Sequence, residues 1–202
     1  IGGKNPLPDE PHLKPGDVLY DVGAEHGDLS ALYATWLAHE SPAVQAAGGW
    51  SQPHGGIVLV EGSDKFWPVI KATFEANGLT PLGCWAGFAS DVDSPEELRT
   101  PSWSDPSLTV GGTWPGWAND WTPKAHHGFK SLVESKQTIP NIRYDTLAGH
   151  VPVPDALTID VEGAEARVLR GSEQLLQEVR PLVWTSVHPE LLSFDYPEWP
   201  GM

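Results

Sequence analysis

The chain has 202 residues and a formal net charge of −15, with 27 acidic residues against 12 Lys and Arg. This length suffices for one α/β domain spanning residues 1–202 with a hydrophobic core, and the acidity would repel a phosphate backbone, so we expect no nucleic-acid partner. A single cysteine, Cys84, favours a reducing compartment. Because the sequence has neither a membrane-length apolar run nor a signal-peptide pattern, we expect a cytoplasmic protein without a membrane span.

The first informative pattern is the run Leu-Tyr-Asp-Val-Gly-Ala-Glu-His-Gly at residues 19–27. Residues 1–16 before it contain four prolines and predict an extended arm. The run itself predicts a buried strand, a tight turn and the start of a helix. Glycines at 23 and 27 let the backbone pass close to a ligand. The spacing lacks the first Gly-x-Gly of the dinucleotide fingerprint, which weakens a nicotinamide or flavin interpretation.

The next elements alternate helix, strand and helix. The first helix is predicted to turn one apolar stripe toward a sheet. That stripe consists of Leu29, Leu32, Tyr33, Trp36 and Leu37. Residues 40–56 predict a surface loop, and 57–60 a buried parallel strand that ends at Glu61. A second amphipathic helix, with Phe66, Val69, Ile70 and Phe74 on one side, is predicted to end at Asn77-Gly78.

A long stretch without regular patterning follows a third strand predicted within Thr80–Ala89. This insert, residues 91–140, is rich in tryptophan and proline. Its length is typical of a lid or binding loop, and its aromatic content argues against disorder. Two interpretations remain open: Trp117, Trp121 and His126 stack on a sugar or other flat acceptor, or the insert forms a small satellite core.

The last third of the chain predicts two more strands. Residues 142–147 fit a short edge strand or a turn, and residues 156–161 a buried strand that ends in acid. A helix is predicted to open at Glu162, to break at Gly171 and to continue with Ser172 as its cap. Residues 181–187 form the last predicted strand, and His188 follows it.

Polar residues follow several of these strands. In an open parallel sheet, ligands bind outside the carboxyl ends of the strands, where the strand order reverses. The turn at residues 21–27, Glu61, Asp160 and His188 would all gather at that edge. The sequence therefore predicts a small-molecule site there.

These segments resemble the FkbM family of methyltransferases. The resemblance rests on Asp21-Val22-Gly23-Ala24 with Gly27, on the strand-end Glu61, and on Thr-Ile-Asp-Val-Glu-Gly-Ala-Glu at 158–165 with Val-Leu-Arg-Gly at 168–171. It covers roughly residues 15–190. It implies an α/β fold with a Rossmann-like, doubly wound, mostly parallel sheet. It also implies methyl transfer, with S-adenosyl-L-methionine as cofactor and usually a hydroxyl oxygen as acceptor.

The resemblance also implies cofactor contacts. Glu61 is expected to accept hydrogen bonds from both ribose hydroxyls; the alternative is an acid that complements a helix dipole. The methionine and adenosyl side would be lined by Asp21, Gly23, Glu25, His26 and Gly27, although Glu25 and His26 fit an exposed turn equally well. Ser90 and Asp91 are expected at the adenine edge, with turn formation as the other explanation of Asp91.

Asp160 and His188 are the candidate catalytic residues. Asp160 would hold the methionine ammonium or orient the acceptor hydroxyl, with helix capping as the alternative. His188 is the candidate general base, or it only starts a turn before Pro189. Glu162 and Glu165 are interpreted as structural, Glu162 with the option of facing the cleft. Asp160 with Glu162 or His188 would also suit a divalent cation, but no metal is assigned.

The chain departs from the family where it stops, at Met202, soon after the fifth strand. Class I methyltransferases normally add a helix and an antiparallel strand pair there, which predicts either a shortened chain or an edge completed by a second copy or another partner. Two rival functions are a nucleoside-binding module without turnover and an NAD-linked oxidoreductase. Sugars, glycan or lipid hydroxyls and small natural-product alcohols are all compatible acceptors.

Overall fold

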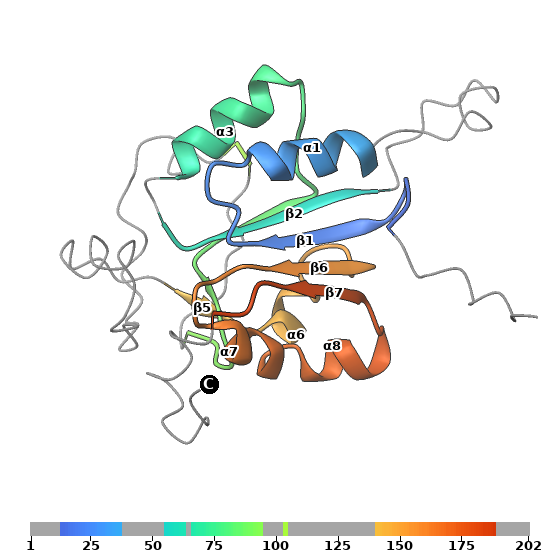
Figure 1. The fold of residues 1–202 in the computed structure, drawn as a ribbon, viewed down its shortest axis with the longest axis vertical. Coiled ribbons are helices and arrows are strands. Elements are labelled where there is room, and N and C mark those ends of the chain that lie inside the picture. Colours follow the sequence, from blue (N-terminus) through green and yellow to red (C-terminus); the bar gives the residue numbers. More distant parts are fainter. Residues whose placement is uncertain (1–12, 38–54, 64–65, 95–102, 105–139, 189–202) are drawn as a thin grey trace, which may run out of the picture.

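Five parallel strands form the centre of the computed structural model, which describes residues 13–37, 55–63, 66–94, 103–104 and 140–188. The strands are β1 (Val18–Val22), β2 (Gly56–Glu61), β3 (Gly83–Ala86), β6 (Ala156–Ile159) and β7 (Leu182–Thr185), in the order β3-β2-β1-β6-β7. The chain builds outward from β1 through β2 to β3 and then returns to the other side of β1. The strand order therefore reverses between β1 and β6 (Figure 1).

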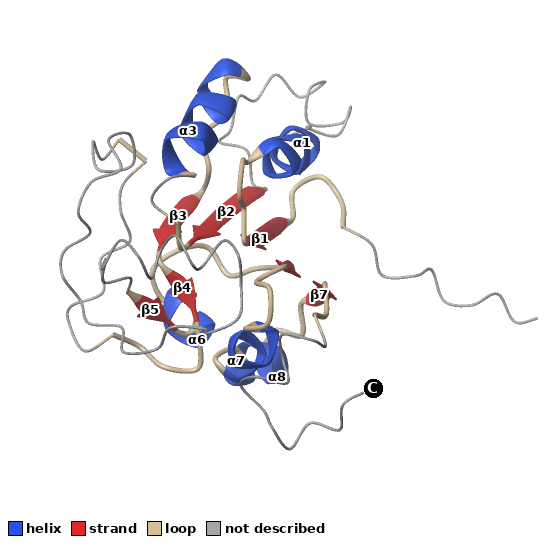
Figure 2. Ribbon diagram, turned by 60° about the vertical axis from the view of Figure 1, so that its left-hand side comes forward, coloured by secondary structure: helices blue, strands red, loops and turns tan. Residues whose placement is uncertain are grey.

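Helices cover both faces of this sheet. The helices α1 (Asp28–Leu37) and α3 (Trp67–Ala76) lie on one face, and α6 (Tyr144–Leu147), α7 (Glu165–Arg170) and α8 (Glu173–Glu178) lie on the other (Figures 1 and 2). Every residue of β1 and β2 is buried, which explains why these strands are nearly continuous apolar runs. The predicted α/β, doubly wound, parallel fold is confirmed.

The predicted apolar stripe of α1 is wrong for most of its members. Its buried face consists of Ser30, Ala31, Ala34 and Leu37. Leu29, Leu32 and Trp36 are 55%, 65% and 39% exposed. The helix turns its small residues inward because the buried Asp21 carboxylate accepts a hydrogen bond from the Ser30 hydroxyl at 2.5 Å. Hydrophobicity alone does not reveal such a polar anchor.

The second helix, α3, follows the prediction more closely. Ile70 and Phe74 are fully buried, together with Trp67, whereas Val69 is 42% exposed. The chain leaves the helix through Asn77 and Gly78, and Gly78 has a φ of +66°, a conformation that glycine adopts at low cost.

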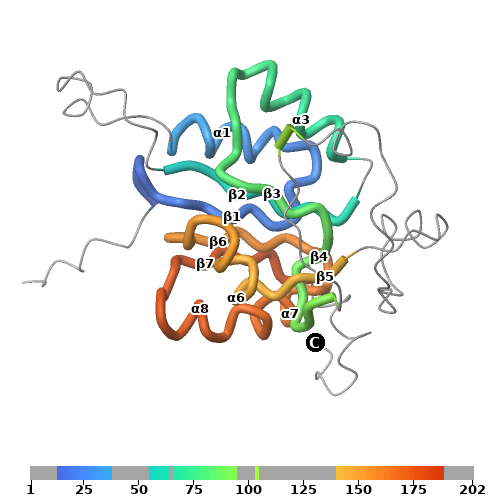
Figure 3. Tube along the Cα trace, turned by 180° about the vertical axis from the view of Figure 1, so that it is seen from behind, coloured from blue at the N-terminus to red at the C-terminus, as the bar shows by residue number. Residues whose placement is uncertain are grey.

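The predicted third strand divides at Gly87. β3 belongs to the main sheet, whereas β4 (Phe88–Ala89) pairs in parallel with β5 (Asn141–Ile142) in a separate two-stranded sheet (Figure 3). A Cβ at Gly87 would lie 2.4 Å from the Pro140 carbonyl oxygen. Residues 142–147, predicted as an edge strand or a turn, contain the end of β5 followed by α6.

The predicted helix after β6 starts later than expected, at Glu165, and breaks into α7 and α8 at Gly171-Ser172. A Cβ at Gly171 would lie 1.9 Å from the Ser90 carbonyl oxygen. Ser172 does not cap α8 with its side chain, because its hydroxyl donates to the Val168 carbonyl at 2.7 Å. The Asp145 carboxylate of α6 instead accepts hydrogen bonds from the backbone N–H groups of Gln174 and Leu175 in the first turn of α8, and the sequence analysis missed this cap.

Several predictions fall outside the described residues. These are the arm over residues 1–12, the loop over 40–54, most of the insert and anything beyond His188. Within the insert, Trp103 is described, and it packs against α3. Its ring centroid lies 5.6 Å from that of Phe74, and its carbonyl accepts a hydrogen bond from Lys71 Nζ. No helix in the described residues has the length and apolar character to cross a membrane.

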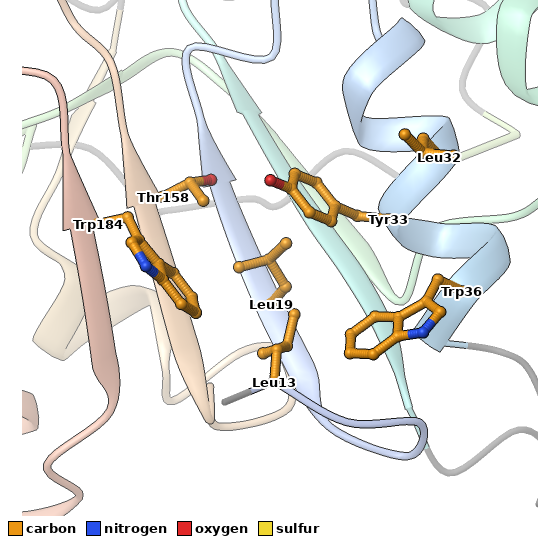
Figure 4. A pocket seen from close by; sticks show the side chains of 7 residues that line it. All are labelled: Leu13, Leu19, Leu32, Tyr33, Trp36, Thr158 and Trp184. Atoms are coloured by element: carbon orange, nitrogen blue, oxygen red, sulfur yellow. The ribbon is translucent and has the colours of Figure 1, made fainter. Parts of the chain in front are cut away.

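One side of β6 and β7 carries an apolar groove. Its volume is about 630 Å³, and its lining comes from α1, from the strand bodies and from the preceding chain: Leu13, Leu19, Leu32, Tyr33, Trp36, Thr158 and Trp184 (Figure 4). Among the described strands β7 has one neighbour, β6, and Val183 and Trp184 on it are 37% and 46% exposed. Association of this edge with a second copy or another partner stays a prediction.

The Asp145 cap predicts a measurable loss of stability. In Asp145→Ala, the N–H groups of Gln174 and Leu175 lose carboxylate acceptors at 3.2 and 2.9 Å, and Arg143 loses its ion pair at 2.8 Å. We expect the free energy of unfolding to fall by about 1–2 kcal/mol in urea denaturation. Glu178→Ala, at the exposed end of the same helix, is the control and should change it by less than about 0.5 kcal/mol. Equal losses in the two variants would contradict the assigned cap.

Candidate active site

The carboxyl ends of β1, β2 and β6 meet at one edge of the sheet. Val22 pairs with Val60 on one side and with Ile159 on the other. The next residues continue the contacts, because the Gly23 N–H donates to the Val60 carbonyl at 2.9 Å and the Asp160 N–H donates to the Val22 carbonyl at 3.0 Å. The structure therefore brings together Gly23, Glu61 and Asp160, which the sequence analysis expected to converge.

Gly23 sits in the closest of these contacts. Its φ is +87°, and a Cβ built on it would lie 2.0 Å from the Asp160 carbonyl oxygen. Gly27, at the end of the same turn, has a φ of +73°, and a Cβ there would press on Ile70 of α3 at 3.2 Å. The two glycines thus hold the turn against β6 at one end and against α3 at the other.

Glu61 fastens the turn to the end of β2. The residue is 8% exposed, and its two carboxylate oxygens accept hydrogen bonds from the Glu25 N–H at 3.0 Å and the Ser63 N–H at 2.6 Å. Burial raises the pKa of Glu61 to about 7, against the two backbone hydrogen bonds, which lower it. The Glu61 carboxylate thus accepts hydrogen bonds from the loops after β1 and β2. It does not cap α3, which begins at Trp67 without a side-chain cap.

Glu25 and His26 form the exposed rim of the turn. Glu25 has a φ of +50°, an unusual value for a residue with a side chain. This conformation aims its backbone N–H at Glu61. The His26 ring packs edge-on against Phe66, with centroids 4.9 Å apart. Both side chains are solvent-exposed, so their predicted contacts with a cofactor stay predictions.

Asp21 lies beneath the site. Its carboxylate accepts hydrogen bonds from the Ser30 hydroxyl of α1 and from the Thr158 hydroxyl of β6 at 2.8 Å, and burial raises its pKa. With 8% exposure and both oxygens engaged, it joins the first helix to the two central strands. This geometry supports a fastening role, and direct contact of Asp21 with a cofactor stays a prediction.

Asp160, Glu165 and His188 form a cluster on the other side of the turn. The His188 Nδ1 lies 2.8 Å from Glu165 Oε1, and its Nε2 lies 3.6 Å from Asp160 Oδ1. Burial lowers the His188 pKa, but the Glu165 hydrogen bond and the charges of Glu165, Asp160 and Glu162 outweigh burial and raise it above 6.5. The sequence analysis missed the contact between Glu165 and His188, because 23 residues separate them.

Ser90 and Asp91 follow β4, close to α7. Ser90 is 2% exposed, and its hydroxyl donates to Asp91 Oδ1 at 3.3 Å. The same oxygen lies 3.4 Å from Arg167 Nη1 of α7. Their predicted place at the adenine edge stays a prediction, as do the roles of Trp117, Trp121 and His126, which lie outside the described residues. In the part of the chain that the structure describes, no group of three or more His, Cys, Asp or Glu side chains is placed to hold a metal ion.

Comparison with known families agrees with this geometry. The sequence model of the methyltransferase FkbM domain matches residues 21–201. The chain belongs to the FkbM methyltransferase family. No curated protein and no solved structure shows significant similarity to it.

The match extends over the sheet edge just described, from Asp21 through Glu61 to His188. The doubly wound sheet is thus a Rossmann-like methyltransferase core, and the suspected family is confirmed. The candidate site of this FkbM methyltransferase is the reversal of strand order between β1 and β6, because open parallel sheets generally bind ligands at such a point.

Because of the close contact at Gly23, adding a single methyl group there should lower the stability of the fold substantially. Gly23→Ala should lower the free energy of unfolding by about 1–2 kcal/mol for the left-handed backbone and by about 1–3 kcal/mol more for the clash with Asp160. Gly78→Ala is a matched control, because its φ is +66° and nothing lies within 4 Å of the added Cβ. Denaturation curves showing equal losses for the two variants would mean that the close contact is not real.

Proposed function

We propose that this methyltransferase uses S-adenosyl-L-methionine to methylate a hydroxyl oxygen on a sugar, glycan or small-molecule natural product. The observation that carries the proposal is Glu61, a buried carboxylate at the end of β2, held against the Gly23–Gly27 turn at the reversal of strand order. This arrangement supports a nucleoside cofactor, because a fixed carboxylate accepts charge-assisted hydrogen bonds from a pair of ribose hydroxyls.

The carboxylates at this edge of the sheet fit such a cofactor in two further respects. Each Glu61 oxygen accepts one backbone hydrogen bond, from the Glu25 N–H or the Ser63 N–H, and a carboxylate oxygen has capacity for a second donor. The edge is also acidic, with Glu61, Asp160 and Glu162 near the turn. Negative charge there complements the positive charge of a sulfonium donor. When bound, S-adenosyl-L-methionine would supply an electrophilic methyl group.

His188 would receive the proton that the acceptor hydroxyl loses during methyl transfer. In the neutral imidazole, one ring nitrogen carries hydrogen and the other a lone pair. With Nδ1–H donated to Glu165, Nε2 is the basic atom, and it faces Asp160. An acceptor hydroxyl placed there would lose its proton to Nε2 while its oxygen forms the bond to the methyl carbon, and the bond from that carbon to the sulfonium sulfur would break and leave a neutral thioether. Methyl transfer is a displacement in line, so alignment of the acceptor would supply much of the acceleration.

Asp160 has two candidate roles, which remain alternatives. Its side chain is 59% exposed at the edge, where it would orient the acceptor hydroxyl or hold the methionine ammonium. In either role, its charge stabilises the imidazolium that forms at His188. The net charge of −15 supports a small-molecule or glycan acceptor rather than nucleic acid.

Glu61 predicts pH-dependent cofactor binding. Since the ionised form is the stronger acceptor and its pKa is about 7, affinity for S-adenosylhomocysteine should rise between pH 6 and pH 8 in isothermal titration calorimetry. Glu61→Gln should bind about 10- to 100-fold more weakly and lose the pH dependence.

Glu75→Gln, on the exposed side of α3, is the control and should bind like the parent. NAD should not bind to any of the three proteins. If Glu61→Gln retains parental affinity, the ribose assignment is incorrect.

His188 predicts a separation of binding from turnover. His188→Ala should bind S-adenosylhomocysteine like the parent but reduce transfer of labelled methyl by about 10²- to 10⁴-fold. The acceptors to test are a panel of monosaccharides, oligosaccharides and small alcohols. His150→Ala, in an exposed turn before β6, should retain parental transfer. Parental transfer by His188→Ala would remove the general base from the proposal, and cofactor binding without any transfer would favour a non-catalytic binding module.

A further inference from the structure

Glu165 makes an unusual pair of contacts for the first residue of a helix. Its carboxylate turns back onto the preceding loop, and both oxygens accept hydrogen bonds from the Gly163 N–H, at 3.0 and 3.1 Å. The loop presents this N–H through two residues with positive φ, Glu162 at +50° and Gly163 at +107°. The hydrogen bonds from Gly163 therefore hold the Glu165 carboxylate in place independently of its contacts with other side chains.

The same carboxylate contacts His188. Glu165 Oε1 lies 2.8 Å from His188 Nδ1, so one oxygen is shared between a backbone donor and an imidazole donor. Exposure increases along the cluster: 3% for the Glu165 side chain, 26% for His188 and 59% for Asp160. The imidazole thus has a buried acceptor behind Nδ1 and the open edge of the site in front of Nε2.

This arrangement selects one tautomer of the imidazole. An ionised carboxylate only accepts hydrogen bonds, so the proton of neutral His188 resides on Nδ1 and the lone pair on Nε2. The other charged groups that face the ring are Asp160 and Glu162, both in the loop before α7. Asp160 lies 3.6 Å from Nε2, beyond hydrogen-bond distance, so it does not fix the tautomer as Glu165 does.

We propose that Glu165 is a positioning residue for methyl transfer, which holds the His188 imidazole with Nε2 directed at the acceptor hydroxyl. The inference rests on the proposed function, since it needs His188 to act as a base. A carboxylate behind a catalytic imidazole is a general way to set tautomer and orientation and to stabilise the imidazolium. In this protein the carboxylate comes from α7 and the imidazole from the chain after β7. The packing of α7 against the sheet therefore sets the orientation of the His188 imidazole.

The decisive variant is Glu165→Gln, which has nearly the same shape. Its amide oxygen can still accept from Gly163, but its amide N–H would donate to His188 Nδ1 and move the imidazole proton to Nε2. Nitrogen chemical shifts of ¹⁵N-histidine-labelled protein report the tautomer without any substrate. We expect the Nδ1–H form in the parent and the Nε2–H form in Glu165→Gln, with His188→Ala identifying the resonance.

Activity and pH dependence provide the second readout. Glu165→Gln should bind S-adenosylhomocysteine like the parent and lower kcat by about 10²- to 10⁴-fold. Loss of the negative charge also lowers the His188 pKa, so the acidic limb of kcat should move to lower pH. Glu165→Asp should retain the parental tautomer and recover part of kcat.

Glu162→Gln serves as the matched comparison, because it removes a nearby charge from the same loop. It should lower the His188 pKa without changing the tautomer. A role of Glu165 confined to loop stability would change the unfolding temperature of Glu165→Gln and leave tautomer and pH profile as in the parent, which would overturn the proposal.

Failure of the proposed function gives a different pattern. The parent would then transfer no methyl group to any acceptor in the panel while His188 still changed its tautomer in Glu165→Gln, and the positioning role would be overturned with the function. If the parent transfers methyl groups and Glu165→Gln does so at the parental rate, the proposed function survives and only the positioning role is overturned.

Discussion

The contact between Gly23 and the Asp160 carbonyl is the constraint on which the site depends. Two central strands end side by side there, and the backbone of one loop lies against the backbone of the other without space for a Cβ. Gly23 also bonds to the end of β2 through the Val60 carbonyl. One glycine therefore sets the relative positions of the turn, Glu61 and the loop that leads to Glu165.

Three buried carboxylates then define the chemistry around this contact. Asp21 accepts from hydroxyl groups below the turn, Glu61 from backbone N–H groups beside it, and Glu165 from a backbone N–H and the His188 imidazole. Buried carboxylates need such donors, because an unpaired charge in a protein interior costs several kcal/mol. Burial still raises the pKa of Asp21 and Glu61, and raised carboxyl pKa values of this kind are common at functional sites.

The residues proposed to bind the cofactor and those proposed to deprotonate the acceptor lie on different sides of β1. Glu61 and the turn lie on the β1–β2 side, and His188 with Glu165 lies on the β6–β7 side. A cofactor gripped by the first group and an acceptor deprotonated by the second would meet over the reversal of strand order. The apolar groove lies on the face of the sheet that α1 covers, and its lining includes none of these carboxylates.

The sequence by itself determined the parallel, doubly wound sheet and the polar residues that follow its strands, because continuous apolar runs, glycine turns and strand-end acids are local patterns. It did not determine the buried face of α1, where the Ser30 bond to Asp21 outweighed the hydrophobic periodicity. It also did not reveal Asp145 as the cap of α8 or Glu165 as the partner of His188. Only the tertiary structure decided these pairings, since each joins residues of two different segments of the chain, and a hydrogen bond depends on how those segments lie in space.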